Sequence, residues 1–177
     1  MFIKNKCYNL IILFAYLILC FIIFDTNKIS KVNTSIKRPG AIPIEKDIIG
    51  NITIDKINLK KPLYKIESTK NQVDQNVTIL KESTFPDQEE STLFIAAHSG
   101  SSSISYFEQL DELNKNDIIK IMYLNETYFY KVTSIWEEEK NGFIHVKKDN
   151  KKQLILTTCS PDHKGKQLVV SSKLIKK

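Results

Sequence analysis

The feature that most constrains the fold is a series of short extended segments that begins at Ile48 and continues to the end of the chain. Each segment is rich in β-branched, aliphatic or aromatic residues, and polar turns separate the segments. Runs of this kind predict strands rather than long helices. Seven or eight strands drawn from nine candidate segments predict an all-β domain with a closed or nearly closed barrel. The candidate segments are 48–54, 57–63, 77–80, 92–97, 118–124, 127–136, 143–146, 154–158 and 168–175.

Two local signals add detail to this barrel. Ser105 and Glu108 have the spacing of a helix capping box, and Phe107, Leu110 and Leu113 follow at helical spacing. We therefore expect a short helix here, and one or two short helices in the whole domain. Asn125–Glu126 separates two β-rich runs, which is typical of a hairpin.

The N-terminal part has a different character. Leu10 to Phe24 is an unbroken apolar run of 15 residues, preceded by Lys4 and Lys6. Such a run favours a single transmembrane anchor with a cytoplasmic N-terminus and an exported domain. A cleaved signal peptide is the rival interpretation, but bulky residues occupy the place of a cleavage site. We expect no second membrane segment after the last strand. The predicted organisation is 1–9 cytoplasmic, 10–24 anchor, 25–47 polar tether and 48–177 exported barrel.

The charge composition excludes some functions. Lys and Arg number 26 against 20 Asp and Glu, a net charge of +6. Arg38 is the single arginine of the sequence and falls in the predicted tether. Sequence-specific nucleic-acid recognition relies on bidentate arginines, so a nucleic-acid partner is not expected. Three widely spaced cysteines without a His/Cys cluster predict neither a disulfide framework nor a metal site, and we expect no cofactor.

One cysteine and one histidine stand where chemistry is expected. Cys159 ends an apolar strand segment and precedes a turn, a position that fits a nucleophile or a buried small side chain equally well. An unpaired thiol at a strand end of an exported domain is a liability unless it is used, which favours the nucleophile. A thiol nucleophile needs a base or a cation nearby. His98 also ends an apolar strand segment and is the preferred partner. His145, inside the predicted strand 143–146, and His163, in the turn after Cys159, are the alternatives.

These residues resemble those of the sortases, which are membrane-anchored cysteine transpeptidases. Thr92–His98 is similar to the strand that leads into the family's catalytic histidine, and Leu156–Cys159 is similar to its L-x-T-C motif. The resemblance extends from about Ile48 to Ile175. Supporting matches are Ile49–Ile54, Asn58–Leu63, Tyr106–Leu110 and Leu113–Ile119.

The resemblance implies an eight-stranded sortase-type barrel and a thioester mechanism. Cys159 is expected to attack the Thr–Gly carbonyl of an L-P-x-T-G-like sorting signal. An amine of peptidoglycan or of a pilin then resolves the thioester, while His98 shuttles protons. Thr158 is expected to orient substrate or to line the groove, although it can equally be an ordinary strand residue. Hydrolysis is the expected side reaction.

The family's third catalytic residue, an arginine on the strand after the cysteine, has no counterpart in the exported domain. Two spacings that occur in the family place its position at Gln167 or at Lys166. Neighbours on a strand face opposite sides, so one of the two can face the groove. Loss of an oxyanion donor commonly lowers rates by about 10²–10³-fold, so we expect a slower or differently tuned enzyme.

Two other functions stay open at this point. A pilin-polymerising sortase usually has an N-terminal lid with an aspartate–aromatic pair, which the tether lacks. A binding-only, inactive barrel is the second alternative. Glu137–Glu139 is expected to be a solvated acidic turn after Trp136.

Overall fold

The computed structural model describes residues 46–147 and 150–177. The predicted cytoplasmic segment 1–9, the anchor 10–24 and all but the last two residues of the tether lie outside the described residues. Within the described part of the chain, no helix is long and apolar enough to cross a membrane.

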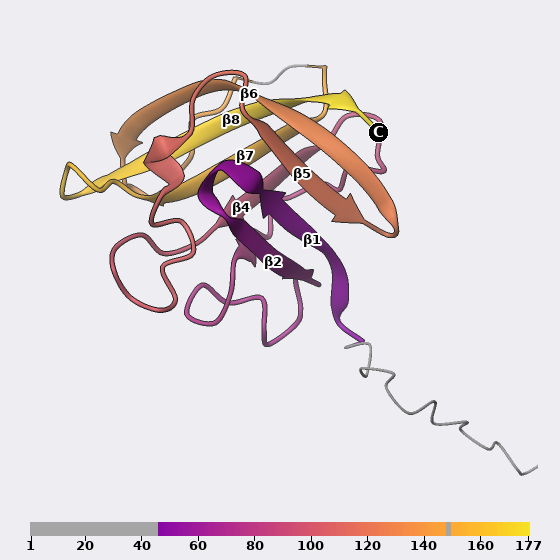
Figure 1. Cartoon of the computed structure of the whole chain (residues 1–177), viewed down its shortest axis with the longest axis horizontal. Coiled ribbons are helices and arrows are strands. Elements are labelled where there is room, and N and C mark those ends of the chain that lie inside the picture. The colour runs from indigo at the N-terminus through magenta and orange to yellow at the C-terminus, as the bar shows by residue number, and fades with distance from the viewer. Residues whose placement is uncertain (1–45, 148–149) are drawn as a thin grey trace, which may run out of the picture. The chain divides into compact units, whose positions relative to one another are not determined.

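The described residues form one eight-stranded sheet that curves into a nearly closed barrel (Figure 1). The strand order is β2-β1-β5-β6-β8-β7-β4-β3. The first and last strands of this order are β2 and β3. Asn76, just before β3, donates a 2.6 Å hydrogen bond to the carbonyl oxygen of Pro62 in β2 and so links the two ends of the sheet. The expected all-β barrel class is confirmed. The strands are β1 (Ile48–Ile54), β2 (Leu59–Tyr64), β3 (Thr78–Ile79), β4 (Thr92–Ala96), β5 (Ile118–Tyr123), β6 (Glu126–Glu139), β7 (Gln153–Cys159) and β8 (Lys166–Lys176).

Alternating side chains fill the interior of the barrel. The inward positions of each strand are aliphatic or aromatic, and their burial removes the apolar area that drives folding. Gln153 to Thr158 of β7 are buried on both faces, which explains why this strand is an almost continuous apolar run. Fully buried residues of the core include Ile52, Ile54, Leu93, Ile95, Ile119, Ile121, Tyr130, Leu154, Leu156 and Val170.

The predicted helix at Ser105 is wrong. In this region the structure has a three-residue 3-10 helix, η2 (Leu110–Glu112), and the other helix of residues 46–147 and 150–177 is the 3-10 helix η1 (Asp55–Ile57). The Ser105 hydroxyl does not cap a helix, because it donates to the carbonyl oxygen of Ser99 at 3.0 Å. The preceding serine-rich loop therefore uses the group that the capping box would require.

The predicted strand 143–146 is also wrong, since the described segment 141–147 is irregular. Its backbone bonds to side chains of the sheet instead of to a neighbouring strand. The amide of Gln167 donates to the carbonyl oxygen of Phe143 at 2.6 Å, and the backbone N–H of His145 donates to Glu138 at 3.2 Å. The segment thus lies over β6 and β8 without joining the sheet.

The predicted hairpin between β5 and β6 is present, but its turn lies one residue earlier than expected. Tyr123 pairs with Glu126, so the two turn residues are Leu124 and Asn125. Both have positive φ, 48° and 68°, as a two-residue turn of type I′ requires.

Gly50 generates the first testable prediction. It pairs with both β2 and β5, and a methyl group at its Cβ position would overlap the carbonyl oxygen of Met122. We expect Gly50→Ala to lower the free energy of unfolding by about 1–3 kcal/mol, because the backbone of two strands must shift. Urea unfolding followed by tryptophan fluorescence measures this. Gly142→Ala is the control, since open space surrounds Gly142 and only its positive φ opposes the change. Equal losses in the two variants would contradict the steric explanation.

Candidate active site

Two parallel strands bring the predicted nucleophile and base to one edge of the sheet. β4 pairs with β7 in parallel, and Ala96 lies opposite Thr157. The pairing extends one step further, because the backbone N–H of Ala97 donates to the carbonyl oxygen of Thr157 at 3.3 Å. Since both strands end at the same edge, His98 and Cys159 emerge there together. Each is partly exposed, whereas Ala97 and Thr158 beside them are buried.

Two side-chain hydrogen bonds fix this edge. The hydroxyl of Ser99 donates to the carbonyl oxygen of Cys159 at 3.0 Å, and the hydroxyl of Thr158 donates to the carbonyl oxygen of Ala97 at 2.8 Å. Each bond joins the residue next to one functional side chain to the strand of the other. Of the two positions that the sequence left open, Thr158 has that of an ordinary strand residue. Thr158 is 5% exposed and faces away from Cys159 along the strand, so it holds the backbone before His98.

His98 has a carboxylate partner that sequence reasoning missed. Its Nε2 lies 2.8 Å from Oδ1 of Asp74, which comes from the loop between β2 and β3. The contact leaves the Nδ1 atom of the ring for another partner. The side chain of Asp74 is 78% exposed and that of His98 is 38% exposed, so the pair is open to solvent. No local pattern around Asp74 indicates it, because Asp74 lies in an irregular loop 24 positions before His98.

Cys159 also has a partner that the sequence did not reveal. The ammonium nitrogen of Lys140 lies 3.1 Å from the Cys159 sulfur. Lys140 directly follows β6, and its backbone N–H donates to the carbonyl oxygen of Gly165 at 2.9 Å in the turn before β8. Because β6 pairs with β8 as far as Glu139, the next residue, Lys140, is held close to the Cys159 thiol.

The strand register separates the two candidates for the third residue. Cys159 pairs with Gln167, and Gln167 pairs with Glu138 on its other side. Directly paired residues share a face of a sheet, so these three form one row on the outer face. Lys166 pairs with Glu139 and points to the opposite face. The amide nitrogen of Gln167 donates to Glu138 at 2.9 Å, in addition to its bond to the 141–147 segment.

Glu137–Glu139 is the end of β6, and the expected solvated acidic turn is wrong. The Glu138 side chain is only 13% exposed. Its carboxylate accepts hydrogen bonds from Gln167, from the indole N–H of Trp136 at 3.4 Å and from His145. Burial alone raises the pKa of Glu138, but these hydrogen bonds to the carboxylate outweigh it and bring the net pKa below the ordinary value. His145 contacts Glu138, not Cys159.

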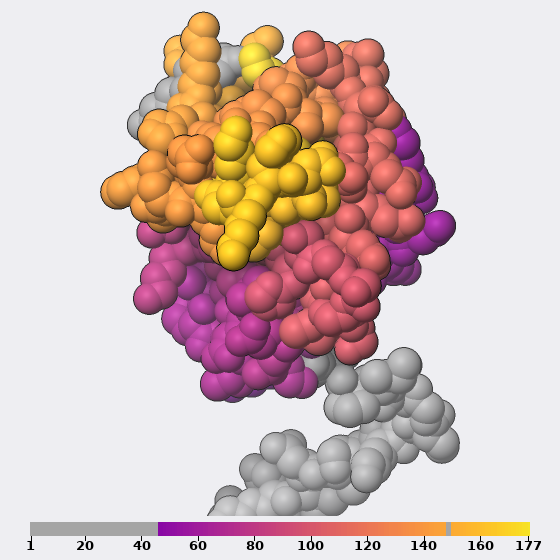
Figure 2. Space-filling view, turned by 90° about the vertical axis from the view of Figure 1, so that its left-hand side faces the viewer, coloured from indigo at the N-terminus to yellow at the C-terminus, as the bar shows by residue number. Residues whose placement is uncertain are grey.

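Glu137, on the other face, organises the turn after Cys159. The Ser160 hydroxyl donates to Glu137, and Nδ1 of His163 lies 2.7 Å from the same carboxylate. The Ser160 hydrogen bond, together with that from His163, lowers the pKa of Glu137 despite the opposing effect of desolvation. His163 is thus tied to the turn that sets the start of β8. Figure 2 looks onto this side of the molecule, where gold atoms of the last part of the chain lie against orange atoms of the segment that precedes them.

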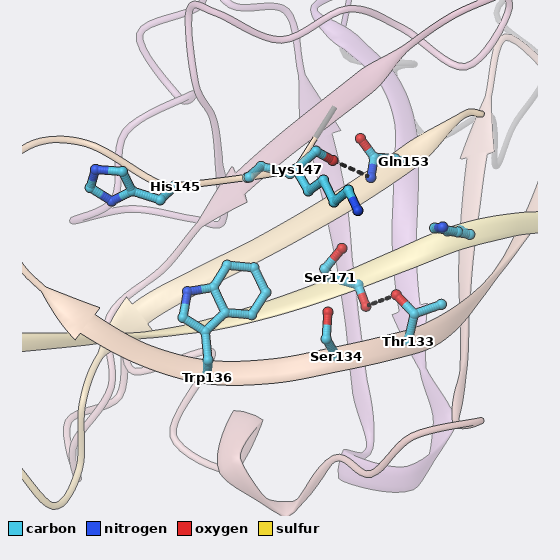
Figure 3. A pocket seen from close by; sticks show the side chains of 9 residues that line it. Thr133, Ser134, Trp136, His145, Lys147, Gln153 and Ser171 are labelled. Atoms are coloured by element: carbon cyan, nitrogen blue, oxygen red, sulfur yellow. Dashed lines mark hydrogen bonds between the residues drawn. The ribbon is translucent and has the colours of Figure 1, made fainter. Parts of the chain in front are cut away.

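A cavity of about 530 Å³ lies next to the Cys159 row on the outer face. Trp136 and Ser171 from the sheet form one wall, and His145 and Lys147 of the irregular segment form the other (Figure 3). Trp136 pairs with Val169, which pairs with Thr157, so the cavity begins one row from Cys159. Its lining combines an indole and an imidazole ring with hydroxyl, amide and ammonium groups. Among the described residues, His, Cys, Asp and Glu side chains form no group of three or more that could hold a metal ion.

The environment of Glu138 predicts a pH dependence of stability. Because its pKa in the folded protein lies below the ordinary value of 4.5, its contribution to stability is present above pH 4.5 and is lost as the pH falls through the folded pKa. We expect Glu138→Gln to cost about 1–3 kcal/mol of unfolding free energy near neutral pH, with the difference from wild type shrinking below pH 4.5. Urea unfolding at several pH values measures this. Glu139→Gln is the neighbouring control, and a pH-independent cost in Glu138→Gln would contradict the assignment.

Comparison with known proteins agrees with this geometry. Residues 52–175 match the profile of the Sortase domain. Sortase A of Staphylococcus aureus is 28% identical over 142 residues, which cover 77% of this chain and 68% of that protein. A sortase C of Streptococcus pneumoniae has a TM-score of 0.66 at 27% identity, covering 75% of this chain and 68% of the other. A lid mutant of sortase A from Corynebacterium diphtheriae has a TM-score of 0.65 at 25% identity, covering 73% and 71%. The chain therefore belongs to the sortase family of cysteine transpeptidases.

Proposed function

We propose that this sortase cleaves an L-P-x-T-G-like sorting signal through a thioester on Cys159 and transfers the acyl part, which ends in the threonine carbonyl, to an amine of the cell wall. The observation that carries the proposal is the parallel pairing of β4 and β7, which ends in His98 and Cys159 at one edge. The family match covers both residues. A nucleophile and a proton-transfer group on rigid strand ends are what acyl transfer requires.

In the acylation step, the Cys159 thiolate attacks the carbonyl carbon of the scissile peptide bond. A carbon–sulfur bond forms, and the π electrons of the carbonyl move to its oxygen. When this intermediate collapses, the carbon–nitrogen bond breaks and the leaving amine takes a proton from protonated His98. The products are a thioester on Cys159, neutral His98 and a free amine.

In the second step, neutral His98 removes the proton from the incoming amine as its nitrogen attacks the thioester carbon. The carbon–sulfur bond then breaks and returns the thiolate. The contact between Nε2 of His98 and Asp74 supports this role, because a carboxylate partner fixes the orientation of the ring. Water in place of the amine gives hydrolysis as a side reaction.

We place part of the sorting signal in the cavity beside Trp136. The cavity shares the outer face with Cys159, and its volume of about 530 Å³ accommodates several side chains. Val146 and Gln153 also line a second cavity of about 410 Å³, which extends toward Thr92 and Phe94 of β4. Residues of the irregular segment 141–147 line both cavities, so we expect this segment to contact the sorting signal and to influence which substrate binds.

We further propose that Leu10–Phe24 anchors the chain in a bacterial cell membrane, with the catalytic barrel outside. The support is the apolar length of this run and the lysines that precede it. An anchored enzyme would meet its secreted substrates as they leave the membrane.

Pilin polymerisation is the second candidate, because the similar solved structures include sortase C enzymes, one of them described with pilin substrate specificity. The fold matches sortases of both classes about equally, with TM-scores of 0.65 and 0.66. The acceptor decides between the candidates. A glycine-type or diaminoacid amine supports wall anchoring, whereas a lysine within a pilin-like protein supports polymerisation.

The proposed function predicts a Cys159-dependent hydroxamate. The full-length protein in detergent is incubated with an L-P-x-T-G peptide and hydroxylamine, and the products are identified by mass spectrometry. We expect a peptide hydroxamate from wild type and none from Cys159→Ala, because hydroxylamine resolves the thioester as an amine would. Absence of any product from a library of sorting peptides would support the binding-only alternative and refute the proposal.

The Asp74 contact predicts a smaller effect on the same reaction. We expect Asp74→Asn to lower hydroxamate formation by less than about tenfold, because a solvent-exposed ion pair is weak, while His98→Ala should nearly abolish it. Glu67→Gln, in the same loop, is the control for the change of charge. If Asp74→Asn equals this control, Asp74 has no role in orienting His98.

A further inference from the structure

The proposed mechanism needs a positive charge near Cys159, and no arginine of the described residues supplies it. A cysteine attacks as its thiolate, and the carbonyl oxygen gains negative charge during the attack. Arg38 is the single arginine of the sequence, and it lies outside the described residues. Gln167, which occupies the row of Cys159, is neutral, and its amide nitrogen is engaged with Glu138 and with the Phe143 carbonyl.

Another cation, Lys140, reaches this position from the end of β6. Lys140 lies two residues beyond Glu138, so the alternation of β6 directs it to the face that carries Gln167 and Cys159. Its backbone bond to Gly165 holds it against the turn that joins β7 to β8. The ammonium nitrogen then reaches the sulfur of Cys159 at 3.1 Å, which is within hydrogen-bond range for a sulfur acceptor.

The acidic groups nearest to Lys140 in the sequence have other partners. Glu138 is held by Gln167, Trp136 and His145, and Glu137 is held by Ser160 and His163. These bonds keep two carboxylates from drawing the ammonium away from the sulfur. The other charged or titratable groups around this edge are Glu139 and Lys166 on the strands, Asp162, His163 and Lys164 in the turn, and His98 with Asp74.

We propose that Lys140 is a catalytic residue that replaces the missing arginine. Its ammonium stabilises the Cys159 thiolate in the resting enzyme, with the thiol proton released to solvent or to His98. When the sulfur bonds to the substrate carbon, negative charge passes from sulfur to the carbonyl oxygen beside the same ammonium. Lys140 stays protonated throughout and transfers no proton. This role rests on the proposed function, but the effect on the thiol can be measured without any substrate.

The test measures the alkylation of Cys159 by iodoacetamide as a function of pH. Iodoacetamide is neutral, so a change of local charge alters the thiolate and not the attraction of the reagent. The full-length protein is used, and mass spectrometry of the peptide that contains Cys159 distinguishes this thiol from Cys7 and Cys20. The variants are Lys140→Met, which removes the charge, and Lys140→Arg, which keeps it. Lys164→Met, in the adjacent turn, removes the same charge without a contact to the sulfur.

We expect the midpoint of the alkylation profile to move upward by about 1 pH unit in Lys140→Met, because a cation within contact distance favours a thiolate by that order. Alkylation at pH 7 should fall by about tenfold if the wild-type midpoint lies above that pH. Lys140→Arg and Lys164→Met should resemble wild type. Identical profiles for Lys140→Met and Lys164→Met would overturn the proposal.

Hydroxamate formation separates this proposal from the function on which it rests. If wild type forms the hydroxamate and Lys140→Met forms it at the same rate, Lys140 is not catalytic although the transpeptidase function stands. If wild type forms none while the alkylation midpoint still shifts in Lys140→Met, the charge effect stands and the proposed function fails. Urea unfolding of each variant shows whether a loss reflects the fold, and Lys140→Arg should restore the rate in a folded protein.

Discussion

The parallel pairing of β4 with β7 is the interaction on which the rest of the site depends. Antiparallel neighbours would place the ends of these two strands at opposite edges of the sheet. Parallel pairing places both carboxyl ends at one edge, so residues 61 positions apart meet. The two hydroxyl–carbonyl bonds, from Ser99 to Cys159 and from Thr158 to Ala97, then lock the strand ends to one another. The nucleophile and base consequently rest on backbone that the barrel core immobilises.

The antiparallel register of β6, β8 and β7 determines which charged side chains lie near Cys159. It aligns Glu138, Gln167 and Cys159 in one row. Lys140, which follows β6, lies beyond this row, and its ammonium contacts the sulfur of Cys159. A buried carboxylate on the same face as a reactive thiolate would oppose it. Here hydrogen bonds from Gln167, Trp136 and His145 hold the carboxylate of Glu138 in its ionised form, and Gln167 and His145 also fasten the segment 141–147 over the sheet. One short row of side chains therefore connects the carboxylate of Glu138, the segment 141–147 and the nucleophile Cys159.

Sequence reasoning predicted the parts of this arrangement that strand periodicity controls. The strands, the hairpin and the strand-end positions of His98 and Cys159 follow from local apolar patterns, and all-β class followed from their number. Contacts between distant loops were not predictable in this way. Asp74 and Lys140 reach the site through an irregular loop and a strand terminus, and neither has a local motif. The segment 143–146 has strand-forming residues, yet Gln167 and Glu138 use its backbone groups, so tertiary contacts override its propensity. The position of Thr158 stayed open, because the L-x-T-C resemblance does not state which face the threonine occupies.

The central claim is that Cys159 carries the acyl group of a sorting signal. The most direct measurement is the intact mass of the protein after brief incubation with an L-P-x-T-G peptide and acid quenching, followed by fragmentation of the modified peptide. We expect an adduct equal to the peptide without its leaving amine, located on Cys159 and released by a thiol or an amine. An adduct on another residue, or no adduct while the peptide is cleaved, would contradict it.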